Sequence, residues 1–440
     1  MTEGDNFLGQ VLDLDVGVVG HGGFCVARLG DDPHGRVVFV RHALPGERVR
    51  AQVTEDAGGS FLRADAIAVL VASPDRVAAP CPHAGPGHCG GCDWQHAAGP
   101  AQRKLKHAVV REQFDRLAGV DVSELLREVE QLPGGLLGWR TRIAFAVGAD
   151  GVPGLRRHRS HEIEKVPSCP LGVAGVGDAP ALSDRWSGAS GIEAIRDDDG
   201  ALTLLTHRPS IGRRARGRRP PDRVSVTSGP KRLRYRLGER MFTVDATGFW
   251  QVHPHAAGLI AQALTGAVAP RPGETVLELY SGAGPLTSVL ADAVGPQGRV
   301  LGFESSALAV ADAADNLAVL PWAQVRHGRV NPALLHELEL TPDVVVVDPP
   351  RAGVGREVMA ALLGRHPRAI GYVSCDPATL ARDIRVAIDS GWRLTSLRAF
   401  DAFPMTHHVE CLAGLEPDGI EKTSKTGEGS SQPGEPARTL

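Results

Sequence analysis

Short, almost wholly apolar runs alternate with helix-length segments from about residue 256 to residue 416. The apolar runs include ETVLELY (274–280), RVLGFES (299–305), DVVVVDPP (343–350) and AIGYVSC (369–375). Strands of this kind are buried on both faces, which happens in parallel sheets that are covered by helices on either side. The sequence therefore predicts a doubly wound, Rossmann-like α/β domain in this part of the chain.

The rest of the chain is expected to form two further units and a polar tail. Residues 7–72 contain five short β-like runs separated by Gly, Asp and Pro turns, which is typical of a small OB-like β-barrel. Residues 73–245 combine a segment rich in Pro, Gly, Cys and His, one amphipathic helix, further β-like runs, and a polar surface excursion at 176–200. We expect a multidomain α/β protein with a barrel (7–72), a central β-rich domain (73–245), the α/β domain (246–416) and a disordered tail (417–440).

The cysteine content and the hydropathy of the chain limit the classes of protein to which it can belong. The chain begins without a basic and apolar leader, and no apolar run approaches the roughly 20 residues that span a bilayer. We therefore expect a cytoplasmic protein without a membrane segment. Seven cysteines in such a chain argue against a disulfide framework, and metal binding or catalysis becomes their favoured use.

Positive charge is concentrated in one segment, although the net charge of the chain is −3. Between Arg208 and Arg240 there are twelve Lys or Arg residues and two acidic ones. The densest run consists of Arg213, Arg214, Arg216, Arg218 and Arg219. A run of this kind is either a solvated loop or a contact for a phosphate backbone.

A glycine-rich turn follows the first strand of the α/β domain. Gly282 and Gly284 lie at the carboxyl end of that strand, where sheets of this type bind ligands. Glu304 ends the next strand, where an acid can accept hydrogen bonds from both hydroxyls of a ribose. A dinucleotide site would have a third glycine at the position of Thr287. A lone Gly-x-Gly also occurs in plain strand–helix turns, but in this context it favours S-adenosylmethionine over NAD.

Reactive side chains follow two other strands of the same domain. Asp348 begins the turn Asp348-Pro349-Pro350, and Cys375 ends the next apolar run. A thiol at this edge is suited to covalent catalysis, which then requires a positioned base, and Glu410 is the base that we expect. A cysteine at the end of a buried strand is more often inert packing. The flanking turns favour the catalytic interpretation here.

These motifs resemble the TrmA and RlmD type of RNA uracil-C5 methyltransferase. The matching stretches, in the order of that family, are FWQVHP (249–254), LELYSGAG (277–284), DPPRAG (348–353), VSCDPATLARD (373–383) and HHVE (407–410). The resemblance implies a class I methyltransferase domain that uses S-adenosylmethionine to methylate C5 of uridine in rRNA or tRNA. It implies that Gln251 and Tyr280 contact the cofactor beside Gly282, Gly284 and Glu304, that Asp348 lines the pocket, that Cys375 adds to C6 of the base, and that Glu410 removes the C5 proton.

The front of the chain agrees with this resemblance. Residues 7–72, with PGERV at 45–49, look like the TRAM barrel, an RNA-binding module found at the amino end of many family members. Members of the RlmD branch also carry a [4Fe–4S] cluster, whose ligand order is matched here by Cys81, Cys89, Cys92 and Cys169. Two thiolates separated by two residues can hold one cluster edge, and a distant fourth closes the site. Zinc is the alternative for the same four thiolates.

Three positions depart from the family pattern. The spacing between Cys81 and Cys89 is long, which makes His83 and His88 competing ligands. Asp376 stands where the family commonly has Asn, and a carboxylate beside the nucleophile raises its pKa. Gly328-Arg329 follows a strand where an acid near the adenine is expected.

Other functions fit the sequence less well. An RNA cytosine-C5 methyltransferase is expected to have a second Cys directly after the proline of the motif that begins at Asp348, and this chain has Pro350 at that position. An adenine amino-methyltransferase would have an aromatic residue in place of Arg351. A non-catalytic RNA-binding or cluster-carrying protein would not need both Cys375 and Glu410. We therefore expect a monomeric enzyme that acts on RNA.

Overall fold

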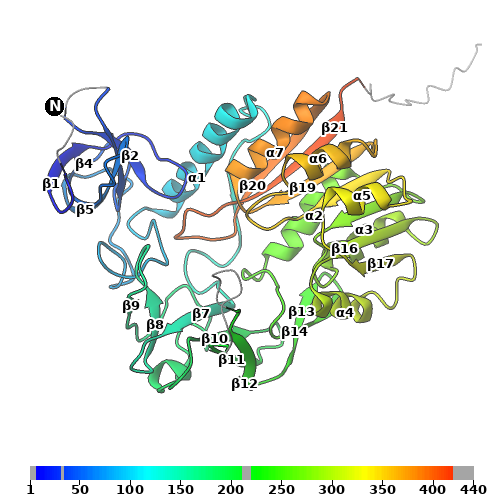
Figure 1. Ribbon diagram of the computed structural model, residues 1–440, viewed down its shortest axis with the longest axis horizontal. Helices are drawn as coiled ribbons and strands as arrows, with labels where there is room; N and C mark the ends of the chain where they lie inside the picture. Colours follow the sequence, from blue (N-terminus) through cyan, green and yellow to red (C-terminus); the bar gives the residue numbers. More distant parts are fainter. Residues whose placement is uncertain (1–5, 31–33, 211–219, 420–440) are drawn as a thin grey trace, which may run out of the picture.

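The computed structural model describes residues 6–30, 34–210 and 220–419. Figure 1 shows a small sheet at one end of the molecule, a large helix-covered sheet at the other, and a third sheet along the bottom of the view. The predicted disordered tail, from residue 420 onward, and the arginine run within 211–219 lie outside the described residues. No helix in the described ranges is both long and apolar enough to cross a membrane.

The N-terminal unit is a curled five-stranded sheet with the strand order β1-β4-β5-β3-β2. Its strands are β1 (Val11–Asp15), β2 (Cys25–Arg28), β3 (Val37–Arg41), β4 (Arg48–Glu55) and β5 (Phe61–Val71). In β4 the apolar side chains of Val49, Ala51 and Val53 are buried while the residues between them face outward. This alternation follows from the period of two along a strand. All five predicted strands are confirmed, and β1 and β2 form the two edges of the sheet.

The central unit is a six-stranded sheet with the order β12-β11-β10-β7-β8-β9. Its strands are β7 (Arg142–Val147), β8 (Pro153–Arg156), β9 (Ile163–Glu164), β10 (Gly191–Arg196), β11 (Leu202–Arg208) and β12 (Arg223–Ser228), and a short helix, η2 (Pro180–Ser183), precedes β10. The predicted polar excursion at 176–200 is therefore wrong in part, because β10 pairs with β7 and β11 in the middle of the sheet.

The large sheet has eight strands in the order β17-β16-β15-β18-β19-β21-β20-β6. Strands β15 to β19 pair in parallel, whereas β21 is antiparallel to both β19 and β20. The strands are β6 (Val129–Gln131), β15 (Thr275–Leu279), β16 (Arg299–Glu304), β17 (Ala323–His327), β18 (Val344–Val347), β19 (Ala369–Ser374), β20 (Trp392–Asp401) and β21 (Glu410–Pro417). The doubly wound α/β domain predicted from the apolar runs is confirmed.

Helices cover both faces of this sheet. One face packs against α2 (Ala256–Val268), α3 (Pro285–Val294) and α4 (Ala307–Asn316). The opposite face packs against α1 (Gly99–Gln113), its continuation η1 (Phe114–Ala118), α5 (Pro332–Glu337), α6 (Arg356–Leu363) and α7 (Pro377–Asp389). The ribbon of β13 (Arg232–Leu237) and β14 (Arg240–Asp245) packs into the core of the first face.

Residues 99–131 and 232–245 therefore pack with the large sheet, and the ribbon of β13 and β14 also contacts the central sheet through Ile195 and Leu205. The predicted domain 73–245 thus shares part of its core with the α/β domain. β6 pairs in parallel with the edge of β20, with Ala399 opposite Val129. The central sheet is thus inserted between two parts of the chain that build one core.

Candidate active site

The glycine turn at the end of β15 is open on the side that faces solvent. Tyr280 and Gly282 have φ angles of 67° and 54°, and a side chain placed on Gly282 would meet no atom within 4 Å. Gly284, with φ 85°, lies against α4, since an added Cβ would be 3.2 Å from Leu317. Non-glycine residues rarely adopt a positive φ, so Tyr280 marks a constrained turn. The turn leaves exposed backbone that a ligand can approach closely.

Glu304 lies beside this turn, at the end of β16. Its carboxylate accepts hydrogen bonds from the Gly282 amide at 3.2 Å and from the Ser306 amide at 2.7 Å. β15 and β16 pair in parallel with Leu279 opposite Phe303, so Tyr280 and Glu304 follow neighbouring positions. The predicted neighbours Tyr280, Gly282, Gly284 and Glu304 are thus brought together at one edge of the sheet.

Three buried or partly buried carboxyls extend the same edge. Burial raises the pKa of Glu278 to about 8, although its carboxyl accepts a 2.5 Å hydrogen bond from Thr287. Burial also raises the pKa of Asp348 to about 7. For Glu410, which is 3% exposed, burial and then the charge of Asp348 raise the pKa well above its usual value. Such a group of carboxyls is chemically suited to a cationic ligand, and it fits the sulfonium and ammonium of S-adenosylmethionine.

Cys375 and Glu410 lie close together just beyond the end of an antiparallel strand pair. β19 ends at Ser374, which is opposite Cys411 of β21, so Cys375 follows this pair on one strand and Glu410 precedes Cys411 on the other. The charge of Glu410 acts on the Cys375 thiol, in agreement with this placement. Burial and then the charge of Glu410 raise the pKa of the Cys375 thiol to about 11, and Arg351 acts in the opposite direction. The predicted nucleophile and base are neighbours, and Asp348 is close enough to act on both.

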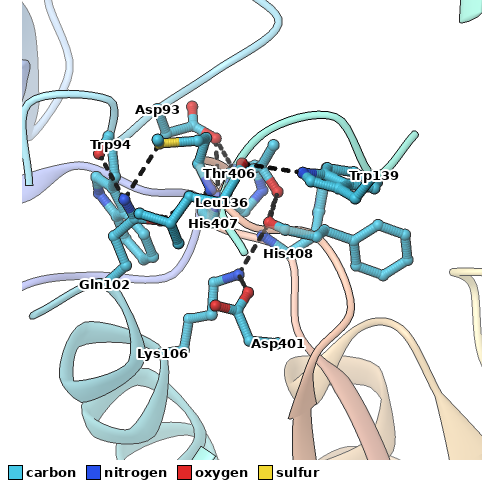
Figure 2. Close-up of polar contacts among 12 residues, drawn as sticks. Asp93, Trp94, Gln102, Lys106, Leu136, Trp139, Asp401, Thr406, His407 and His408 are labelled. Carbon is cyan, nitrogen blue, oxygen red and sulfur yellow. Dashed lines mark hydrogen bonds and ion pairs between the residues drawn. The ribbon is translucent and has the colours of Figure 1, made fainter. Parts of the chain in front are cut away.

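The loop that leads into Glu410 is held by buried polar contacts (Figure 2). Lys106 of α1 is fully buried and bonds the Asp401 carboxylate at 2.5 Å and the Phe403 carbonyl at 3.0 Å. Asp93 bonds both the backbone amide and the ring of His407, at 3.0 and 2.6 Å. Breaking a buried charge pair is strongly destabilising, so these contacts define where β21 begins and thereby where Glu410 stands.

Gln251 is not joined to the cofactor turn by a hydrogen bond among the described residues. It lies between two residues that anchor its segment. Trp250 stacks on Tyr235 of β13 at 4.8 Å between ring centroids, and the Val252 carbonyl accepts hydrogen bonds from the Thr141 amide and hydroxyl. The Gln251 side chain itself is half-buried.

The four cysteines of the predicted metal site lie in one neighbourhood. Burial raises the pKa of Cys89, and Cys169 and Cys81 both raise it further, while Cys169 and Cys89 act in the same way on Cys92. His83 and His88, the competing ligands, both direct Nδ1 to Glu164 at 3.1 Å. Among the described residues, no three His, Cys, Asp or Glu side chains are arranged to hold a single metal ion. The predicted metal site is therefore not confirmed.

A basic groove on the central sheet was missed by the sequence analysis. It has a volume of about 700 Å³ and a floor of small residues that includes Ala144, Ala146 and Gly191. Its basic lining residues are Arg156, Arg157, His158, Arg159, His161 and His207. The run RRHRSH at 156–161 carried the signal.

Several arginines of the segment 208–240 pair with acids of this chain, as Arg157 and Arg159 of the groove also do. Arg232 bonds Asp312 and Asp315, and Arg240 bonds Asp292. These side chains therefore serve contacts within the protein, as a solvated or structural basic segment would.

Comparison with known proteins agrees with the fold and the motifs. A family model described as tRNA (Uracil-5-)-methyltransferase matches residues 231–416, and a TRAM domain model matches residues 6–67. An RNA methyltransferase of Streptomyces avermitilis is 44% identical over 431 residues, which are 93% of this chain and 99% of that protein. The 23S rRNA (uracil(1939)-C(5))-methyltransferase RlmD of Acinetobacter baumannii is 28% identical and covers 92% of this chain and 95% of its own length.

A solved structure extends the agreement to the whole architecture. The crystal structure of the Pyrococcus abyssi tRNA (uracil-54, C5)-methyltransferase in complex with S-adenosyl-L-homocysteine has a TM-score of 0.64 to this chain at 22% identity. It covers 91% of this chain and 100% of its own. The matched family region begins at residue 231, which agrees with the packing of β13 and β14 on the large sheet. The TRAM domain and the family resemblance are confirmed, and the chain belongs to the RNA uracil-5-methyltransferase family.

Proposed function

We propose that the protein transfers a methyl group from S-adenosylmethionine to C5 of a uridine in structured RNA, rRNA or tRNA, through a covalent adduct with Cys375. The observation that carries this proposal is the placement of Cys375 close to Glu410, beside the open glycine turn and Asp348. A nucleophile and a base are thus adjacent at the edge where the cofactor fits. The experiment that tests the proposal follows the mechanism below.

Cys375 activates the base by adding to it. The C5 carbon of uracil is too weak a nucleophile to take a methyl group unaided. Addition of the Cys375 thiolate to C6 forms a C6–S bond and moves an electron pair to C5 and O4, so that C5 gains carbanion character. The cofactor supplies an electrophilic methyl group, which C5 takes. Arg351, which stabilises the thiolate, helps Cys375 to reach its reactive form.

Glu410 completes the reaction by removing the proton that C5 still carries. As that proton leaves to the carboxylate, the C5–C6 double bond re-forms and the C6–S bond breaks, which returns Cys375 as a thiolate. Burial makes the ionised form of Glu410 unfavourable unless a positive charge lies nearby. A sulfonium bound at this edge would favour the ionised form of Glu410, and the carboxylate would bind a proton more tightly once that positive charge has gone, which is when the C5 proton must be accepted.

The RNA has two candidate contact surfaces on this protein. The TRAM domain is one, and the basic groove on the central sheet is the other. Phosphate contacts from such surfaces supply affinity and salt dependence and carry little base recognition. The target uridine must leave its stack to reach Cys375, so loops are expected to react faster than paired stems.

The test is methyl transfer from isotopically labelled S-adenosylmethionine to total RNA of a strain that lacks the gene. Mass spectrometry of nucleosides from separated rRNA and tRNA should find the label as 5-methyluridine in one of the two fractions. Label found as 5-methylcytidine would favour the cytosine-C5 alternative, and no label in either fraction would favour a non-catalytic RNA-binding protein.

Cofactor binding is expected to release protons. At pH 7 the Asp348 carboxyl, with its pKa raised to about 7, is about half protonated in the free protein, and a cation beside it lowers that pKa. Titration calorimetry in buffers of different ionisation enthalpy should therefore show release of more than about half a proton for each S-adenosylmethionine bound, because Asp348 gives up about half a proton and Glu410 loses its proton beside the same positive charge. S-adenosylhomocysteine, whose sulfur is uncharged, should release less, and the Asp348→Asn protein should release about half a proton less than the wild type with S-adenosylmethionine. Equal proton release with both ligands would contradict this view of the site.

We propose that Cys81, Cys89, Cys92 and Cys169 hold a [4Fe–4S] cluster. The four thiols act electrostatically on one another, yet no group among the described residues suits a single ion. The order of the four cysteines along the chain, with Cys89 and Cys92 separated by two residues and Cys169 far away, supports a cluster held by four thiolates. The site joins the Cys-rich segment to the connection between β9 and β10 of the central sheet, so its role is structural.

Protein purified without oxygen should be brown and contain about four irons per chain. Cys169→Ser should lose iron, solubility and RNA binding while S-adenosylmethionine still binds, because the cofactor turn lies on a different sheet. Cys25→Ser, which changes a buried cysteine of the N-terminal sheet, is the matched control and should keep its iron. Stoichiometric zinc without iron would overturn the cluster and leave the methyltransferase proposal intact.

A further inference from the structure

The loop between β1 and β2 reaches from the N-terminal sheet to the nucleophile. The His21 ring nitrogen Nε2 lies 3.3 Å from Oδ2 of Asp376, the residue that directly follows Cys375. Both side chains are only partly exposed, at 36% and 22%. The contact between His21 and Asp376 thus joins the TRAM domain to the end of β19, where the proposed nucleophile lies.

Two further contacts hold the same loop in place. The Gly23 carbonyl accepts a 3.0 Å hydrogen bond from the buried indole of Trp94. Gly23 has φ 84°, and an added Cβ would lie 2.9 Å from the Cβ of His407 and 3.0 Å from that of Asp93. The loop therefore packs against the segment that leads into Glu410 as well as against Asp376, and no residue larger than glycine fits at this point.

The two oxygens of Asp376 have separate partners. Oδ1 accepts hydrogen bonds from the Ala378 and Thr379 amides at 3.0 and 2.9 Å, which caps the N-terminus of α7. Oδ2 faces His21. Burial alone would raise the pKa of Asp376, but the His21 ring and the Thr379 amide lower it to about 2. A rigid, ionised carboxylate therefore stands next to the nucleophile.

A carboxylate in this position opposes formation of the Cys375 thiolate. The charged groups that act on the thiol are Glu410, Arg351, Asp348 and Asp376, and only Arg351 favours the thiolate. A group that donates a hydrogen bond to the Asp376 carboxylate offsets part of its negative charge and so weakens its effect on the Cys375 thiol. His21 occupies that position and comes from a different sheet.

We propose that His21 is a positioning residue for the nucleophile: by bonding Asp376 it offsets the charge beside Cys375, so that thiolate formation depends on the seating of the N-terminal sheet. This inference rests on the proposed role of Cys375. The RNA-binding module then contributes to the chemistry as well as to affinity, and RNA that shifts the module changes the reactivity of the thiol.

The test measures the reactivity of the thiol in the full-length protein without RNA or cofactor. Alkylation of Cys375 by iodoacetamide is followed by peptide mass spectrometry across pH 7 to 10 in five proteins, which are the wild type, His21→Ala, His21→Gln, Asp376→Asn and the double variant His21→Ala with Asp376→Asn. His21→Ala should slow alkylation about threefold to tenfold throughout this pH range, because a smaller fraction of the thiol is ionised at each pH. His21→Gln, which keeps an N–H donor, should recover most of the rate.

The Asp376→Asn background separates a charge effect from a structural one. An asparagine oxygen can still cap α7 but carries no charge, so removing His21 from this background should change the alkylation rate by less than about twofold. An equal slowing by His21→Ala in both backgrounds, or no slowing in either, would overturn the proposal. The assay requires no methyl transfer, so a failure of the uracil-C5 proposal would appear separately in the labelling experiment.

Discussion

Cys375→Ala is expected to abolish methyl transfer, with a loss on the order of 10⁴-fold or more, because removing a covalent nucleophile leaves only the binding contributions to the rate. S-adenosylmethionine affinity should stay within about threefold, since the cofactor turn of β15 and the carboxylate of Glu304 are unchanged. Single-turnover transfer of labelled methyl groups measures the first quantity and calorimetry the second.

Cys411→Ala is the matched control for this experiment. Cys411 is fully buried in the neighbouring strand and packs into the core of the face covered by α7. Removing its sulfur leaves a small cavity and should lower stability by about 1 kcal/mol without affecting the chemistry. Activity in Cys375→Ala within tenfold of the wild type would show that no thiol adduct is formed at this residue.

Glu410→Gln is expected to stop the reaction after methyl transfer and to trap the RNA on the protein. The amide cannot accept the C5 proton, so the C6–S bond of the adduct cannot break by elimination. Turnover should fall by about 10² to 10⁴-fold, and a protein–RNA species should survive denaturing electrophoresis. Mass spectrometry of its RNA fragment should show the added methyl group.

The double variant Cys375→Ala with Glu410→Gln is the control, and it should form no adduct with the same RNA. Two results would assign Glu410 another role. The first is an adduct that lacks the methyl group, which would place Glu410 before transfer. The second is normal turnover, which would place the base elsewhere.

The fold was predictable where the hydrophobic pattern is local. The valine run of β18 and the apolar run of β19 are buried along their whole length, and the sequence shows this directly. β6 and β10 were missed for different reasons. β6 has three residues and is held by a partner at Ala399, far along the chain. β10 lies within a stretch that is polar on average, although Ile192, Ala194 and Ile195 are buried.

Some residues of the candidate site could likewise be located from the sequence, and others could not. Cys375, Asp348 and the glycine turn could be located because each follows a recognisable strand, and the carboxyl ends of parallel strands share one edge. The antiparallel placement of β21, which sets Glu410 close to Cys375, has no local signal. Lys106 and His21 are single polar residues in ordinary surroundings, and their partners Asp401 and Asp376 are fixed only by tertiary packing.

The pairing of Lys106 with Asp401 also bears on how this chain folds as it leaves the ribosome. The two residues are 295 positions apart, and the central sheet is made between them. At a rate of synthesis of roughly 5 to 20 residues per second, Asp401 is added about 15 to 60 s after Lys106 of α1. During that interval a lysine destined for a fully buried position has no counter-charge, and Val110 and Phe114 have no large sheet to pack against, whereas Leu105 and Val109 can already pack on the N-terminal sheet. The nascent chain therefore presents a helix with a partly unburied apolar face for most of its synthesis, which is the kind of surface that chaperones bind.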